Sequence, residues 1–441
     1  MKNKPIPDYF LITALLSLLL GLLFGLWASL QYVWPGLGKS VFAFTCLRPL
    51  HTLWVVSWIL LSAIGGVYHY LNQNNPASTI DKKLMLTHYV GLVFIGLSIA
   101  LCYLSGQFAG KEYLEFPSVF FLPILLSWML FGFYFWKKTR GSFKTQPVYL
   151  WMWATGIVFM IYHFAEAHLW LLPYFKGHFI QNMALQWKSG GSYVGAWNML
   201  VYGTSLYIVS LVSGNKQAAH SPKAFFFYFL GLTNLMFGWA HHVYLLPTAP
   251  WMRYFAYAIS MTEWVVLVSI LKEARKETQK QAQHLYSITE QLINLSGFWV
   301  LLNIVLALLI SIPAINLFTH GTHTTVAHSM GTTIGINTLI LLAAISYRCE
   351  SGSKFSVSSQ KILRIGLSIF KPFFFIFWCC LLFMGMRKTF WQWGDNKVTF
   401  GVFQQSMWVV HVIFVGIGLM TALGLAFLAV GLLKSLLQKS A

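Results

Sequence analysis

The sequence carries little charge, and acidic residues are especially scarce. Only 9% of its 441 residues are charged, and 11 Asp and Glu stand against 30 Lys and Arg, whereas 57% of the residues are hydrophobic. A soluble globule of this length needs far more polar side chains to cover its surface. The composition therefore excludes a soluble protein and indicates a lipid environment.

Long hydrophilic stretches are also lacking. Apolar runs of roughly 20 residues, the length that crosses a hydrocarbon core about 30 Å thick, recur along the whole chain. The runs lie at residues 9–33, 47–71, 84–104, 117–136, 148–172, 191–213, 222–246, 251–272, 293–317, 321–347, 362–384 and 403–433. We expect an all-α membrane protein of about 12 transmembrane helices, with residues 1–441 in a single integral membrane domain. The most hydrophilic stretch, residues 272–284, mixes both charge signs, is expected to lie in water, and is given no catalytic role.

Lys and Arg are distributed unequally between the two sets of loops. One set includes Lys137, Lys138, Arg140 and Lys144, and it is much richer in basic residues than the other set. Because short loops rich in Lys and Arg stay in the cytoplasm, both termini are expected to be cytoplasmic. The formal charge of +19 is explained by this orientation and by contact with anionic lipid. No nucleic-acid partner is implied.

Cysteine is sparse, and its spacing is uninformative. The five cysteines show no paired spacing of the kind that binds metals, and most lie in or beside apolar runs. The sequence contains no CxxCH motif, so haem c is not attached to this chain. Neither a disulfide nor a cysteine metal site is predicted.

Histidine, in contrast, is abundant where polar residues are expensive. An ionisable side chain within the bilayer is costly and is a functional candidate by default. Of the 14 histidines, several fall in or at the ends of apolar runs: His51, His69, His88, His163, His168, His241, His242, His328 and His411. A single such residue is usually a satisfied polar group. So many together favour metal or haem ligation over a charge-relay transporter.

Two adjacent histidines and one acid form the first candidate site. His241 and His242 lie near the end of the seventh run, about 100° apart on a helix, so both rings can converge on one metal. A structural polar pair is the alternative. Glu263 lies within the next run and must be protonated, paired or close to a metal, or else be a hydrogen-bonded structural acid.

The second candidate site is on the tenth run. Residues two apart on a helix point about 200° away from each other, so His328 and Met330 face opposite sides. Imidazole and thioether are both axial haem ligands, so one helix can hold two haems. Met330 as a packing residue is equally compatible with the spacing. In the second run, His51 is placed to ligate one haem and Arg48 to meet its propionates.

Four segments resemble known motifs in order and spacing. They are residues 47–52 (LRPLHT), 110–117 (GKEYLEFP), 238–242 (GWAHH, with Glu263) and 319–328 (THGTHTTVAH). These segments resemble the catalytic subunit of bacterial nitric oxide reductases, in the haem-copper oxidase superfamily. The resemblance covers nearly the whole chain. It implies a subunit I-like helix bundle with a low-spin haem b, a high-spin haem b and a non-haem iron.

The resemblance also implies residue roles. His328 would hold the high-spin haem, and His241 and His242 the non-haem metal, iron or copper. His51 would be one ligand of the low-spin haem. The remaining matches are Arg48 and Lys111 near haem propionates, Glu112 on a structural calcium, and Glu263 as the buried acid beside the metal centre.

Two departures from the family pattern matter most. Met330 stands where the family has a second histidine, so a His51/Met330 low-spin haem is expected, with a higher potential than a bis-histidine haem. In helix six, Gly190, Val194 and Asn198 stand at the positions of a third histidine and two glutamates.

A substitute for the missing helix-six ligand is available in the fifth run. His163 and Glu166 are three residues apart and share a helix face, so they are possible substitute metal ligands. A proton path or a hydrogen-bonded cap are the other readings of this pair. A smaller departure is Ser62, which replaces a glycine near the calcium site.

The expected function is a membrane haem oxidoreductase that reduces nitric oxide to nitrous oxide, as in denitrification. The alternatives are an enzyme like nitric oxide dismutase, giving dinitrogen and dioxygen, and a non-catalytic haem protein for gas binding or electron transfer. Only eight residues precede the first run, whereas quinol-type reductases have a long extension there. The expected partner is thus a membrane-anchored cytochrome c subunit or another electron donor, in the bacterial inner membrane.

Overall fold

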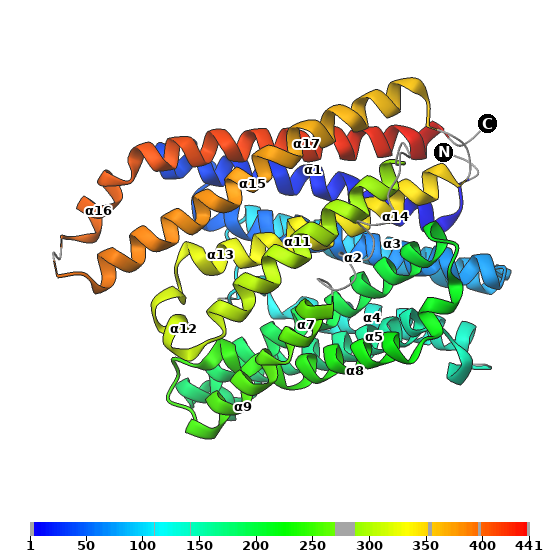
Figure 1. The fold of residues 1–441 in the computed structure, drawn as a ribbon, viewed down its shortest axis with the longest axis horizontal. Coiled ribbons are helices and arrows are strands. Elements are labelled where there is room, and N and C mark those ends of the chain that lie inside the picture. The colour runs from blue at the N-terminus through cyan, green and yellow to red at the C-terminus, as the bar shows by residue number, and fades with distance from the viewer. Residues whose placement is uncertain are drawn as a thin grey trace. The chain divides into compact units, whose positions relative to one another are not determined.

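The computed structural model describes residues 4–109, 111–141, 143–269, 287–351, 355–395 and 398–438. These residues are largely helical, and no strand occurs among them (Figure 1). The hydrophilic stretch at 272–284, for which no catalytic role was predicted, lies outside the described residues.

Ten helices in the described part of the chain are long and apolar enough to cross a membrane. They are α1 (Ile6–Val33), α2 (Phe44–Asn74), α3 (Thr79–Leu104), η1 with α4 (Ser118–Thr139), α5 with η3 (Val148–Leu171), α7 (Phe179–Val212), α11 (Ile288–Ile310), α13 to α14 (His323–Glu350), α15 (Val357–Trp393) and α17 (Trp408–Gln438). The predicted all-α membrane fold is confirmed.

The predicted seventh and eighth runs form shorter helices. The seventh consists of α8 (Pro222–Phe237) followed by the 3₁₀ segment η5 (Gly238–Val243), and the eighth begins as α9 (Pro250–Met261) and continues through helical residues 263–269. With these, each predicted run corresponds to a helical segment, so the expectation of about twelve helices agrees with the structure.

Two helix starts follow directly from local sequence. Ser78 precedes α3, where its Oγ accepts from the Asp81 backbone N–H and the Asp81 carboxylate accepts from the Ser78 N–H. Ser287 and Glu290 form the same reciprocal pair at the start of α11. Each capping box satisfies backbone donors that the first helical turn leaves free.

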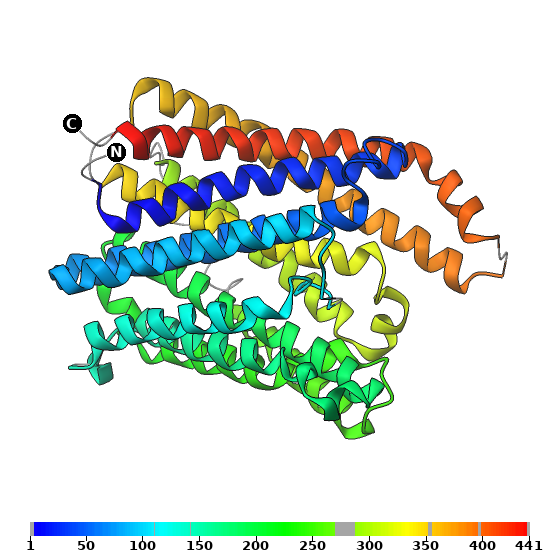
Figure 2. The ribbon, with the colours of Figure 1, turned by 180° about the vertical axis from the view of Figure 1, so that it is seen from behind.

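The chain forms two compact units. Unit 1 comprises Met1–Pro123, Gly321–Met330 and Ile345–Ala441, and unit 2 comprises Ile124–His320 and Gly331–Ala344. The expectation of a single domain stays a prediction. Within unit 1, α1 lies beside α2 and α17, and α15 packs along α17 (Figure 2). Within unit 2, α5 packs along α7.

Helix α15 approaches α13 (His323–Met330) very closely in unit 1. A Cβ atom at Gly385 would lie 2.5 Å from the Thr324 backbone nitrogen, a separation that real Cβ atoms do not show. Three residues later, Lys388 Nζ donates to the Gly321 carbonyl at 2.7 Å. These contacts fix the start of the helix that carries His328 and Met330.

Replacing Gly385 by alanine is expected to push α13 away from α15, because the new methyl group has no space. Overpacking of this kind typically costs about 1–3 kcal/mol. The measurement is the thermal midpoint and the haem content of the detergent-purified protein, both of which should fall. Gly91→Ala is the matched control in the same unit, because a Cβ there meets nothing within 4 Å. Equal behaviour of the two variants would contradict the close approach.

The predicted tenth run is not one continuous α-helix. After α13, residues Gly331–Thr338 form the π-helix η6, and α14 (Leu339–Glu350) follows. The reason lies in the packing of η6 against α11. The Trp299 ring occupies the space beside Gly335, where a Cβ would lie 2.6 Å from Trp299 Cγ, and Asn303 Nδ2 donates to Thr332 Oγ1 at 2.7 Å. A widened turn is a frequent feature of functional segments.

Candidate functional site

His51 on α2 is held in one orientation by α1. Its Nδ1 lies 2.7 Å from the Gly21 carbonyl oxygen, and because a carbonyl only accepts, Nδ1 carries the proton. The neutral ring then presents an unprotonated Nε2 for coordination. The ring packs against Gly25, where a Cβ would lie 2.6 Å from Nδ1. This arrangement fits the predicted axial haem ligand, and the ligation itself stays a prediction.

His328 and Met330 both lie on α13, and both are partly buried. The segment from His323 to Met330 is an α-helix, so side chains two residues apart point about 200° away from each other, as the sequence predicts. The predicted ligation of one haem by His328 and of another by Met330 therefore remains open to test.

Arg48 on α2 lies between two carboxylates of the loop that follows α3. Its Nη1 is 3.1 Å from Glu112 Oε1, and its Nη2 pairs with Glu115 Oε1. The guanidinium carbon also lies 5.8 Å from the centre of the Tyr113 ring, and Tyr113 adopts a left-handed backbone conformation with φ of 65°. Sequence reasoning missed Glu115, although it lies only three residues after Glu112.

The electrostatics of this loop depend on burial. Burial raises the pKa of the Glu115 carboxyl, and the nearby Arg48 guanidinium acts in the opposite direction. Arg48 is thus the cation that opposes the effect of burial on the pKa of this carboxyl. The roles that the resemblance implies, Arg48 and Lys111 near propionates and Glu112 on calcium, stay predictions.

Arg48→Gln is expected to lower the free energy of unfolding by about 1–2 kcal/mol at neutral pH, since a buried carboxylate loses its charged partner. The Arg48 interaction exists only while Glu115 and Glu112 are ionised. The difference from the wild type should therefore be largest at pH 8 and shrink as the pH falls through the raised pKa of Glu115. Thermal midpoints measured at pH 8 and pH 5 test this, and a gap that grows on acidification contradicts it.

The histidine pair lies in unit 2 on η5, which corrects the α-helical geometry assumed from the sequence. The ring centres of His241 and His242 are 4.2 Å apart, with the planes inclined by 42°. The tighter 3₁₀ turn places Ala240 and Val243 on one side, where both are buried against Ala256 of α9. His241 Nδ1 lies 3.3 Å from the hydroxyl of Ser260 on α9.

Helix α7 passes directly beside this pair. A Cβ at Gly191 would lie 2.5 Å from His242 Cδ2 and 2.8 Å from its Nε2, whereas a Cβ at Gly190 would meet nothing within 4 Å. The family pattern placed Gly190 at the position of the family's third histidine. In the structure, the residue of α7 that faces His242 is Gly191, one position later.

Glu263 has an amide as a hydrogen-bond partner. Asn234 Nδ2 on α8 donates to Glu263 Oε1 at 3.3 Å. The contact agrees with the interpretation of Glu263 as a hydrogen-bonded structural acid, and it leaves Oε2 for a proton or another ligand. The catalytic and metal-binding roles of Glu263 stay predictions.

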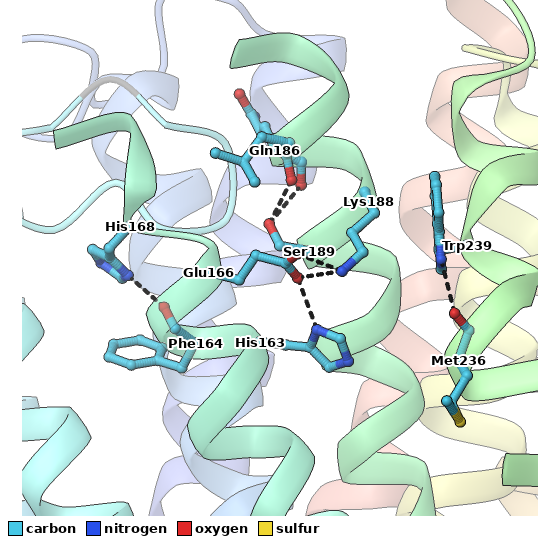
Figure 3. A network of polar contacts seen from close by, with 10 residues as sticks. His163, Phe164, Glu166, His168, Gln186, Lys188, Ser189, Met236 and Trp239 are labelled. Atoms are coloured by element: carbon cyan, nitrogen blue, oxygen red, sulfur yellow. Dashed lines mark hydrogen bonds and ion pairs between the residues drawn. The ribbon is translucent and has the colours of Figure 1, made fainter. Parts of the chain in front are cut away.

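A third polar cluster joins α5 and α7 (Figure 3). Glu166 Oε2 lies 2.9 Å from His163 Nδ1 and 2.6 Å from Lys188 Nζ, and Glu166 Oε1 also pairs with Lys188. Lys188 lies over two rings, 5.5 Å from the Tyr162 centre and 5.8 Å from the Trp239 centre. Glu166 can serve as the predicted substitute metal ligand only after its ion pair with Lys188 breaks. The sequence did not predict this ion pair.

The second metal that the family pattern implies finds an incomplete ligand set. In the part of the chain that the structure describes, no group of three or more His, Cys, Asp or Glu side chains is placed to hold a metal ion. His241 and His242 would supply two ligands, and α7 offers a glycine, Gly191, beside the His242 ring. Haem ligation by His51 is therefore the better-supported part of the cofactor prediction.

Comparison with known proteins gives a family match along nearly the whole chain. The family described as Cytochrome C and Quinol oxidase polypeptide I matches residues 6–436. A curated relative, a nitric oxide reductase subunit of Stutzerimonas stutzeri, is 20% identical over 373 residues, which cover 78% of this chain and 75% of that protein.

A solved structure shares the fold. A heme-copper terminal oxidase dimer studied by cryo-EM superposes with a TM-score of 0.67 at 15% sequence identity, covering 100% of this chain and 85% of that chain. At that identity the likeness establishes the arrangement of the helices. It leaves the reaction to be argued from the site.

Proposed function

Because the chain belongs to the cytochrome c and quinol oxidase polypeptide I family, we propose that it reduces nitric oxide to nitrous oxide at a haem and a second metal. The family and the ten apolar helices of the described residues establish the general class. The chain is a multi-pass membrane haem oxidoreductase, which in bacteria belongs to the inner membrane. The family also implies haem and a metal centre.

The observation that carries the proposal is the placement of Glu263. This acid lies in the same compact unit as His241 and His242, on the segment that follows α9, whose Ser260 contacts His241. The similarity to a component of a nitric oxide reductase supports the choice of substrate. We propose that Glu263, His241 and His242 are the catalytic residues.

The balance of the reaction defines what the chain must supply. Two NO, two electrons and two protons give one N₂O and one water. When bound, haem iron supplies the electrons and a coordination site for NO. The protein orients His51 through the Gly21 carbonyl, and Glu263 carries a proton on Oε2 while Oε1 accepts from Asn234. Buried acids that exchange protons are a common catalytic device.

Electrons must come from a partner. The Stutzerimonas stutzeri relative is itself named as one subunit of a nitric oxide reductase, so it is one chain of an assembly. We propose a membrane-anchored cytochrome c subunit as the donor, with the loop carrying Glu112 as its docking site. Calcium at Glu112 and haem b as the haem type belong to the same proposal.

The test is gas analysis of the purified, haem-containing protein. With NO and a chemical reductant, nitrous oxide should be released. Release of dioxygen from NO without reductant would instead identify a dismutase, an alternative that the replaced positions Gly190, Val194 and Asn198 favour. Haem iron as the sole metal, with no gas product, would identify a non-catalytic haem protein.

A further inference from the structure

Four polar side chains without formal charge form two hydrogen-bonded pairs on η6 inside unit 2. Asn337 Nδ2 on η6 donates to Asn198 Oδ1 on α7 at 2.9 Å. Near the start of η6, Asn303 Nδ2 from α11 donates to Thr332 Oγ1 at 2.7 Å. The two hydrogen bonds join three membrane helices through η6.

Two oxygens of this group are buried and lack a partner. Asn337 is 0% exposed and Asn303 is 3% exposed, and neither Oδ1 atom has a hydrogen-bond partner among the described residues. An amide oxygen in a membrane interior costs several kcal/mol if it accepts nothing. The usual partner of such a group is a buried water molecule.

The π-helix is what aligns the two pairs. In a π-helix the hydrogen bonds join residues five apart, so Thr332 and Asn337 lie roughly above one another on the same face. The same spacing is seen directly in Thr338, whose Oγ1 donates to the Thr333 carbonyl at 2.8 Å. A regular α-helix would separate Thr332 and Asn337 by about 140° around its axis.

The polar chain ends on the face of α7 that touches the histidine pair. Asn198 lies seven residues after Gly191, which is two helical turns or roughly 10 Å along the same face. Gly191 is the residue against which the His242 ring lies. A proton that reaches Asn198 is thus two turns from η5.

We propose that Asn198, Asn303, Thr332 and Asn337 hold a chain of internal water molecules and form a proton-transfer path toward the histidine pair. The path rests on the proposed function, because NO reduction consumes two protons for each N₂O. At each step an O–H bond breaks on one water and a new one forms on the next, while the amides and the hydroxyl stay neutral. No group of the path has to ionise, which suits a low-dielectric interior.

The experiment compares two identical substitutions. Thr332→Val removes the hydroxyl that bonds Asn303, and the control Thr155→Val removes a buried hydroxyl that bonds Tyr228 at 2.7 Å outside the path. Proton uptake is followed by stopped flow with a pH-indicator dye as the purified haem-containing proteins are reduced. Thr332→Val should slow uptake at least about 100-fold, the lower end of the effect of one positioned proton-transfer group, and Thr155→Val should leave it unchanged.

A second readout reports the water itself. Infrared difference spectra of the wild type should show weakly bonded O–H bands that shift in H₂¹⁸O, and Thr332→Val should lose at least one of them. Asn337→Leu should have the same two effects, and Asn337→Ser, which keeps a hydrogen-bonding oxygen, should recover part of the uptake rate.

The outcomes separate the path from the proposed function. If Thr332→Val slows proton uptake but the wild type releases no N₂O, the proposed path is supported and the proposed NO reduction is contradicted. If the wild type releases N₂O but Thr332→Val leaves both proton uptake and the O–H bands unchanged, the proposed path is overturned and the proposed NO reduction is supported. Absence of water bands from the wild type also overturns the path.

Discussion

His51→Ala is expected to remove the low-spin haem from the protein and to abolish NO reduction. The imidazole of His51 is fixed between the Gly21 carbonyl and Gly25, and alanine offers no atom in place of Nε2. Without an axial ligand on α2, the haem loses its anchor on that side. The haem content per chain, measured by the pyridine haemochrome method, should fall by about half, the share of one haem in a two-haem protein, and N₂O release with a chemical reductant should become undetectable.

The control for this loss lies on the same helix. His69 is also on α2, and its Nε2 lies 3.0 Å from Gln73 Nε2, one turn away on the same helix. His69→Ala should retain full haem content and turnover. Retention of both haems in His51→Ala would contradict the prediction that His51 is an axial haem ligand, and with it the predicted His51/Met330 pair.

The second axial ligand of this haem has a spectroscopic signature. Magnetic circular dichroism of the wild type is expected to show a low-spin haem with His/Met ligation, because Met330 follows His328 by two positions on α13. Thioether ligation favours ferrous iron and raises the potential. A bis-histidine spectrum would show that another residue replaces Met330.

The transmembrane architecture was predictable from the sequence because the signal is redundant. A run such as residues 9–33 is apolar throughout, and lipid forces every backbone group of such a run into a helix. The prediction was weakest at the seventh and eighth runs, where α8 ends and η5, which carries His241 and His242, follows. Local hydrophobicity does not distinguish an α turn from a 3₁₀ turn. The turn here is the one that buries Ala240 and Val243 against Ala256, a contact that depends on the packing of α9.

The candidate site was predictable only in its ligating residue types. His51, His241 and Glu263 stand out because ionisable groups inside a membrane are costly. Their partners do not stand out. Lys188 pairs with Glu166 across 22 residues of sequence, and Glu115 pairs with Arg48 across 67. Such pairs depend on which helices pack together, and one sequence does not contain that information.

The π-helix was likewise beyond the sequence. Residues 331–338 read as part of a continuous run, and the widened turn arises from contact with α11 at Trp299 and Asn303. The place where local reasoning fails is thus the place where polar groups of three helices meet. Departures from regular structure often mark functional segments.

Gly191→Ala is expected to displace the His242 ring and reduce the rate of N₂O release at least about 100-fold, the scale of a roughly 1 Å error in the position of a catalytic group. The added methyl carbon would lie 2.5 Å from His242 Cδ2 and 2.8 Å from its Nε2, so the imidazole must move away from α7. A metal bound by His241 and His242 alone should be lost with it, because two ligands bind weakly and no third is placed beside them in the described part of the chain.

Gly190→Ala is the matched control, since it makes the same change one residue earlier on the same helix. A Cβ at position 190 meets nothing within 4 Å, and alanine favours a helix more than glycine does. This variant should keep its turnover and metal content. Wild-type rates in both variants would mean that the position of His242 does not matter to the reaction. A loss confined to Gly190→Ala would mean instead that position 190, as the family pattern had it, faces the metal.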